Sequence, residues 1–150
     1  GGQGDYTVEF EPHATSLEQK GEGYVVASLG EDSGYVPYTS FSAKKSYLEK
    51  NKDTVQAFTD ALQKGMDYVQ DHSPEEIAKA ISPQFPETDM ETLTTIVDRY
   101  YRQDTWKENL VFEEDAFSLL QNILQDAGVL EKQVPYEDLV TKDFAKKAAE

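Results

Sequence analysis

The chain has 150 residues and a formal net charge of −15, which comes from 29 Asp and Glu against 14 Lys and Arg. This length is typical of a single domain, and the acidic balance excludes non-specific nucleic-acid binding, which depends on cationic side chains that neutralise phosphates. The sequence contains no Cys, which excludes disulfides, Cys-ligated zinc, iron–sulfur clusters and thiol catalysis.

The first third of the chain predicts strands. Residues 5–10 alternate aromatic or apolar side chains with polar ones, as a half-buried strand does. A short helix is expected over 13–20. Residues 24–29 then form a nearly continuous apolar run, typical of a strand covered on both faces. After a turn at 30–34, residues 35–43 are expected to be extended again.

The remaining two-thirds of the chain has the apolar spacing of helices. Ser73 provides the strongest start signal, because Pro74 and Glu76 follow it at the first and third helical positions. Gly128 is placed to end a helix. The expected helices cover residues 44–50, 53–71, 74–81, 89–103 and 113–127, with one or two short helices within 136–149.

This order of elements is unusual for a complete domain. Two or three strands come first, and nothing downstream is predicted to complete their sheet. A pair of strands alone is marginal in water, and a strand–helix–strand start is typical of a parallel sheet. The sequence therefore predicts an α/β protein of which this chain is a piece.

Patterns for catalysis and for metal binding are weak. The two histidines, His13 and His72, lie 72 − 13 = 59 positions apart and outside any catalytic motif. The carboxylates of residues 113–115 fall in the first turn of a helix, where they complement its dipole. No calcium-binding loop or phosphate-binding glycine motif is present. We expect no enzymatic activity, no metal and no cofactor.

The most informative stretch is Glu9-Phe10-Glu11-Pro12, where a predicted strand turns into a helix. Ligands of parallel α/β sheets bind beyond the carboxyl ends of strands, which makes this a candidate binding segment. An acid beside a helix N-terminus is also stabilising without any ligand. A ligand role and a structural role for Glu11 therefore both stay open.

Tyr35 and Tyr38 form a second candidate lining. A tyrosine offers a pocket both an apolar ring and a hydroxyl. We expect one of the two to pack in the core instead.

These motifs, taken in order, resemble a known family. Residues 4–12, with their Phe10-Glu11-Pro12 motif, and the strand at 23–28 resemble ABC-transporter substrate-binding proteins of the nitrate/sulfonate/taurine and thiamine-pyrimidine-precursor group. Residues 36–43 look like the crossover strand of that family. Residues 44–70 are similar to its short helix followed by a long one. The resemblance covers nearly the whole chain.

The resemblance implies a type II periplasmic-binding-protein fold of the α/β class, present here as a C-terminal fragment with a few strands followed mostly by helices. Residues 1–30 would be the strand–helix–strand end of the second lobe. Residues 31–150 would be the hinge crossover and the C-terminal helical part of the first lobe. The strands would find their partners in the other half, or pair with a second copy of the chain.

The implied function is that of a non-enzymatic solute-binding protein, which captures a small ligand between two lobes and delivers it to ABC permease subunits. The implied location is extracytoplasmic, in the periplasm or at the outer face of the cell membrane. No apolar run approaches the roughly 20 residues that span a bilayer, so membrane attachment is expected only through a lipid anchor upstream of the chain.

The charges near the motif narrow the ligand class. Residues 1–43 contain a single Lys or Arg, whereas the motif contributes Glu9 and Glu11. Sulfonate or nitrate would require donors for an anion. An amino-substituted heterocycle such as a thiamine pyrimidine precursor, stacked on Phe10 or Tyr38 and donating its amino hydrogens to Glu11, fits these residues better.

An alternative belongs to a different class. The chain could serve as an acidic helical protein-interaction module in the cytoplasm, without a small-molecule ligand. Its apolar helix faces would then dock a partner protein.

Overall fold

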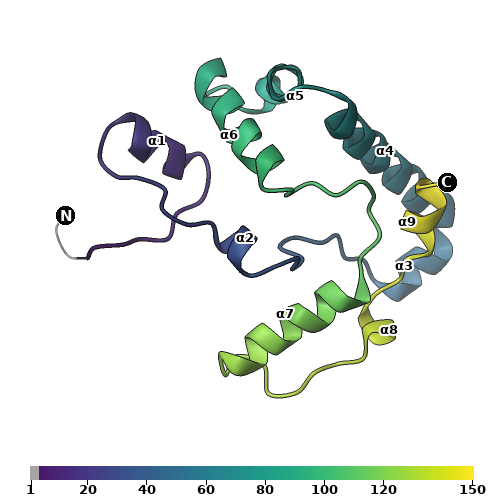
Figure 1. Cartoon of the computed structure of the whole chain (residues 1–150). Helices are drawn as coiled ribbons and strands as arrows, with labels where there is room; N and C mark the ends of the chain where they lie inside the picture. The colour runs from purple at the N-terminus through teal and green to yellow at the C-terminus, as the bar shows by residue number, and fades with distance from the viewer. Residues whose placement is uncertain (1–3) are drawn as a thin grey trace. The chain divides into compact units, whose positions relative to one another are not determined.

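The computed structural model describes residues 4–150, and every regular element in that range is helical (Figure 1). All helices predicted beyond residue 44 are confirmed, with ends that agree to within one or two residues. The elements in chain order are α1 (His13–Gln19), α2 (Leu29–Asp32), α3 (Lys45–Lys50), α4 (Lys52–Asp71), α5 (Pro74–Ile81), the 3-10 turn η1 (Ser82–Gln84), α6 (Met90–Arg102), α7 (Glu114–Asp126), α8 (Tyr136–Leu139) and α9 (Asp143–Ala148).

The predicted strands, and with them the α/β fold class, are wrong for the described part of the chain. No residue from 4 to 150 belongs to a strand. Residues 5–10 and 24–28 have no regular structure, while Leu29 opens α2, a short helix where strand and turn were expected. A strand requires a neighbour that pairs with its N–H and C=O groups, and residues 4–150 provide no such ladder.

The side chains that suggested strands are exposed. Tyr6 and Tyr24 are each 84% exposed, and Val26 is 72% exposed. Strand preference of aromatic and β-branched residues reflects how well they fit a half-buried pleated surface. Without a covering layer the same residues remain extended and solvated, so the alternating pattern alone does not produce a strand.

The chain divides into two compact units, each built from two separate stretches of sequence. Unit 1 takes in the residues up to Leu29 together with His72–Trp106, and unit 2 takes in Gly30–Asp71 together with Lys107–Glu150. The assignment of residues 1–30 and 31–150 to two lobes stays a prediction.

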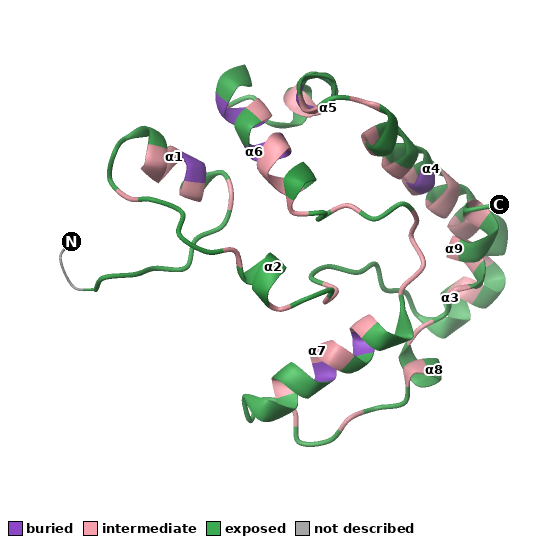
Figure 2. Cartoon of the chain, viewed as in Figure 1, coloured by how far each residue is buried: buried purple, intermediate pink, exposed green. Residues whose placement is uncertain are grey.

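Unit 1 is built around the packing of α5 on α6, with α1 beside α6. The buried residues of α5 and α6 recur at helical spacing, and buried residues are purple in Figure 2. Its apolar core consists of Ile77, Ala78, Leu93, Ile96 and Val97.

The start signal of α5 is confirmed. The Glu76 N–H donates to the Ser73 hydroxyl at 3.3 Å, and the Ser73 N–H donates to the Glu76 carboxylate at 3.0 Å. These reciprocal bonds satisfy backbone donors that the first turn of a helix leaves unpaired. The start of α5 is therefore fixed by local sequence.

Unit 2 holds the helix pair α4 and α9 and an aromatic cluster beside α7. Phe117 of α7 is buried, and its ring makes edge contacts with Phe112 and Tyr136, at centroid distances of 6.1 and 5.7 Å. The Tyr136 hydroxyl donates to the Phe112 carbonyl. The cluster thereby connects α7 to α8.

Two buried glutamines hold extended segments of unit 2 against its helices. The Gln63 amide of α4 donates to the Glu108 carbonyl at 2.9 Å and accepts from the Leu110 N–H at 3.3 Å. The Gln121 amide of α7 donates to the Val134 carbonyl at 3.2 Å and accepts from its N–H at 2.8 Å. A side-chain amide offers the same donor and acceptor as a peptide group. These two side chains therefore make the backbone pairing that a strand would otherwise supply.

Candidate functional site

Glu11 lies at the start of α1, directly before the N-cap residue Pro12, to which it is joined by a cis peptide bond. The Thr15 N–H donates to Glu11 Oε2 at 3.1 Å, and the Thr15 hydroxyl donates to Glu11 Oε1 at 3.0 Å. Proline has no side-chain acceptor, so the neighbouring carboxylate takes the capping role. The Glu11 side chain is only 7% exposed.

Arg99 of α6 donates to two carboxylates of unit 1. Its Nη1 lies 2.7 Å from Glu11 Oε1, and its Nη2 is bonded to Glu18 Oε2. The second oxygen of Glu18 accepts from the Val25 N–H at 2.9 Å. We call Arg99, Glu11 and Glu18 together the Arg99 bridge. This bridge connects both ends of α1 to α6.

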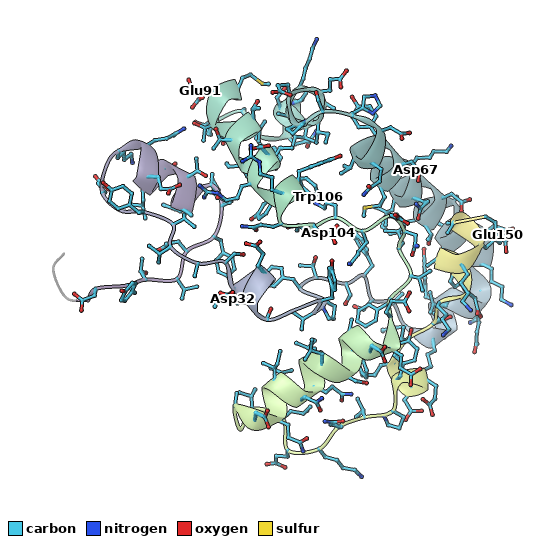
Figure 3. The ribbon with its side chains drawn as sticks, viewed as in Figure 1. Asp32, Asp67, Glu91, Asp104, Trp106 and Glu150 are labelled. Carbon is cyan, nitrogen blue, oxygen red and sulfur yellow. The ribbon has the colours of Figure 1, made fainter. Side chains whose placement is uncertain are left out.

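Helical spacing explains why these side chains meet. Thr15 follows Glu11 by four positions, and Glu18 follows Thr15 by three. This spacing places the three side chains on the same side of the turn that opens α1 and of α1 itself. Arg99 follows the buried Ile96 by three positions and so lies on the same side of α6 as the core. Figure 3 labels Glu91 and Trp106, which mark the beginning of α6 and the segment after its end.

A second polar contact joins the same two helices. The hydroxyl of Thr92, a buried residue of α6, shares its one proton between the Gln19 side-chain oxygen at 3.1 Å and the Asp89 carboxylate at 2.7 Å. The Asp89 carboxylate also accepts from the Thr92 N–H and so caps α6. The start of α6 and the end of α1 are thereby held together.

The Arg99 bridge is charged. The pKa of Glu18 is lowered, first because the Val25 N–H donates to its carboxylate and then because Arg99 does. Burial on its own would lower the pKa of Arg99, but the hydrogen bond to Glu18 and the charges of Glu11 and Glu18 raise it. One guanidinium facing two carboxylates leaves an excess of one negative charge when all three are ionised.

Three of the five predicted ligand residues are neighbours in the sequence, and their role in binding stays a prediction. Glu9, Phe10 and Glu11 follow one another along the segment that leads into α1, and all three belong to unit 1. Phe10 is 63% exposed, and its carbonyl accepts from the Ala14 N–H at 3.2 Å, which fixes its backbone. Glu9 is also exposed.

The other two predicted residues, Tyr35 and Tyr38, belong to unit 2. The expectation that one of them packs in the core is wrong, because they are 59% and 80% exposed. The Lys107 ammonium lies 3.0 Å from the Tyr35 ring centroid, a cation–π contact that covers one face of this ring.

Arg99 and Glu18 are the functional candidates that sequence reasoning missed. Arg99 is one of only two arginines in the chain, and it lies 88 positions from Glu11. The sequence did contain one signal for Arg99, because it falls on the apolar face of a predicted helix. An arginine that is buried on such a face requires an acidic partner.

Between residues 4 and 150 no group of three or more acidic or histidine side chains is arranged to hold a metal ion. Within the same range no helix combines the length and the apolar character that crossing a membrane demands.

Comparison with known proteins places the chain in a family. The family model described as NMT1/THI5 like matches residues 3–77, which is half of the chain. The chain belongs to the NMT1/THI5-like family. The matched range contains all five predicted ligand residues and Glu18, whereas Arg99 lies beyond its end.

A protein of Bacillus subtilis (strain 168) named "Putative binding protein YtlA" is 44% identical to this chain over 146 residues. The alignment takes in 97% of this chain and 44% of that protein, so the chain spans less than half the length of this relative. No solved structure matches the chain significantly.

Proposed function

We propose that this chain is part of an extracytoplasmic solute-binding protein that captures a small ligand between two lobes and delivers it to the permease subunits of an ABC importer. Membership of the NMT1/THI5-like family supports this role. The relative from Bacillus subtilis, which is named as a binding protein, supports it as well. In this proposal the protein is not an enzyme, and a lipid anchor upstream of the chain would attach it to the membrane.

The proposed ligand is an amino-substituted heterocycle, such as a thiamine pyrimidine precursor. The arrangement of Glu11 is the observation that carries this choice. A carboxylate offers about four lone-pair positions. Oε1 of Glu11 already accepts from Thr15 and Arg99, whereas Oε2 accepts from the Thr15 N–H. Oε2, with one donor against two on Oε1, therefore has the greater acceptor capacity left for an amino group of the ligand.

Aromatic surface for stacking completes the proposed site. The exposed ring of Phe10 directly precedes Glu11 in unit 1. Tyr35 and Tyr38 of unit 2 also have exposed rings and stay predicted ligand residues. Glu9 would add a second acceptor. Aromatic side chains with a few placed polar groups are typical of pockets for small heterocycles.

The charge around this segment opposes anionic ligands. The Arg99 bridge carries one excess negative charge, and Glu9 adds another. A sulfonate or nitrate would be repelled there, because such ligands are bound by donors and cations. A ligand with N–H donors would instead be attracted by these carboxylates and could donate hydrogen bonds to them.

The test is calorimetry on the full-length protein with three probes in turn: the aminopyrimidine precursor of thiamine, taurine and nitrate. We expect the aminopyrimidine to bind and the two anions not to bind. Tight taurine binding without aminopyrimidine binding would overturn the proposed ligand class. Binding of none of the three would count against the solute-binding role in the form proposed.

A matched pair of variants locates the binding. Glu11→Ala removes the proposed acceptor, whereas Glu22→Ala removes an exposed carboxylate of the same unit. We expect Glu11→Ala alone to abolish the calorimetric signal of the aminopyrimidine. Equal binding by both variants would exclude Glu11 from the ligand site.

A further inference from the structure

Arg99 holds two carboxylates that lie seven positions apart, Glu11 just before α1 and Glu18 within it. A guanidinium presents five N–H donors in a rigid planar fork, so one side chain can bond Glu11 and Glu18 at once. An ammonium group is a point charge and could not reproduce this double contact with the same geometry. The Arg99 bridge therefore depends on arginine in particular.

The bridge fixes the two segments that flank α1. Glu11 is joined directly to Phe10, whose carbonyl accepts from Ala14. At the other end, Glu18 accepts from the Val25 N–H. Helix α1 has seven residues, and a helix of that length is not stable on its own in water. Its position therefore depends on contacts with α6, among which the bridge supplies two charge-assisted hydrogen bonds.

We propose that Arg99 is a positioning residue for the ligand segment Glu9-Phe10-Glu11, and thereby determines which solutes this segment accepts. The inference rests on the proposed function for the choice of ligand. Arg99 donates to Oε1 of Glu11, which fixes the Glu11 carboxylate and with it the segment that carries Phe10. Arg99 acts through Glu11 and has no contact with the ligand in this proposal.

The first experiment measures the affinity of the aminopyrimidine precursor of thiamine for three variants of the full-length protein. Arg99→Gln removes the charge, Arg99→Lys keeps the charge but not the fork, and Arg102→Gln is the matched control. Arg102 is the other arginine of α6, is 78% exposed at its side chain and pairs with Asp98 within the same helix. We expect affinity to fall about tenfold or more in Arg99→Gln, and less in Arg99→Lys. Arg102→Gln should bind like the unaltered protein.

A purely structural role for Arg99 would produce a different pattern. Melting temperature would then fall in both Arg99 variants, while the folded fraction of each bound the ligand with unchanged affinity. If Arg99→Gln fails to fold, the Arg99→Lys variant tests the proposal instead. Wild-type affinity for the aminopyrimidine in folded Arg99→Lys would overturn it.

The second experiment needs no ligand. Hydrogen exchange of the Thr15 and Val25 amides reports whether the flanking segments are held, because both amides donate to carboxylates of the bridge. We expect exchange at both amides to accelerate about tenfold or more in Arg99→Gln and to stay unchanged in Arg102→Gln. Unchanged exchange in Arg99→Gln would overturn the inference. Failure of the unaltered protein to bind the aminopyrimidine would instead contradict the proposed function.

Discussion

Phe10 combines an exposed ring with a fixed backbone, which is what a stacking platform requires. Stacking of aromatic rings contributes about 0.5–1.5 kcal/mol beyond the area that is buried. We expect Phe10→Leu, which keeps an apolar side chain but removes the ring, to weaken aminopyrimidine binding by roughly two- to tenfold. Calorimetry on the full-length protein measures this change.

The matched control for Phe10 is Tyr6→Leu. Tyr6 lies in the same extended segment and is 84% exposed. The Tyr6→Leu variant should bind the ligand as the unaltered protein does. An equal loss in both variants would mean that the segment responds to any lost aromatic residue, and that Phe10 has no special contact.

The candidate site was predictable from the sequence only in part. An aromatic residue, an acid and a proline in succession form a local signal, which predicted Glu11 beside the start of a helix. Glu11 does lie there and accepts from the Thr15 N–H, whereas its role in ligand binding stays a prediction. Arg99 reaches the same carboxylate from 88 positions away, and no local pattern encodes that meeting. The contact depends on α1 packing beside α6, which is a tertiary event.

At the scale of elements, α1 is attached to α6 by ionised groups, so acid should loosen it. The lowered pKa of Glu18 means that its contribution to stability is present above its ordinary pKa of 4.5 and is lost as pH falls through the lowered folded value. We expect exchange of the Val25 amide, corrected for its intrinsic pH dependence, to accelerate as pH drops below 4.5.

Two variants check the cause of this acid sensitivity. In Glu18→Gln the corrected exchange rate of the Val25 amide should already be raised at neutral pH and should change little on acidification. Glu22→Gln, which removes an exposed carboxylate nearby, should behave as the unaltered protein. An acid response that survives in Glu18→Gln would assign it to another group.

The buried amide of Gln121 gives a prediction for unit 2. Replacing Gln121 by Leu leaves the Val134 N–H and C=O without their side-chain partner, and loss of such bonds costs about 1–3 kcal/mol. Urea denaturation should show a decrease of that size in the free energy of unfolding. Gln125→Leu, an exposed position of the same helix, should change it by no more than about 0.5 kcal/mol. Similar losses in the two variants would contradict the role assigned to Gln121.

The sequence predicted most of the helices of the chain well but not the absence of strands from residues 4–150. The start of α5 is fixed within four residues, because Ser73 and Glu76 satisfy one another's backbone donors. The extended segments at 5–10 and 24–28 have the composition of strands, but a strand is completed only by a partner backbone. Within residues 4–150 that partner does not exist, and Gln63 and Gln121 make the comparable contacts elsewhere.

At the scale of the whole molecule, the chain spans 44% of the length of its Bacillus subtilis relative. Aromatic side chains of the extended segments, such as Tyr6 and Tyr24, are exposed in this range. Contiguous exposed apolar surface is typical of regions that contact another part of a protein or a partner. Because such contacts can involve parts of the protein outside this range, binding should be measured on the full-length protein.

The proposed importer role also predicts where the protein is found. A solute-binding protein must meet its solute before the permease does, so the chain should lie outside the cytoplasmic membrane. We expect protease added to intact cells, after removal of any outer membrane or wall, to degrade this protein while a cytoplasmic marker survives. Cell lysis before protease treatment provides the control, because both proteins should then be cleaved. Survival of this chain together with the marker in intact cells would contradict the importer role and favour an acidic interaction module inside the cell.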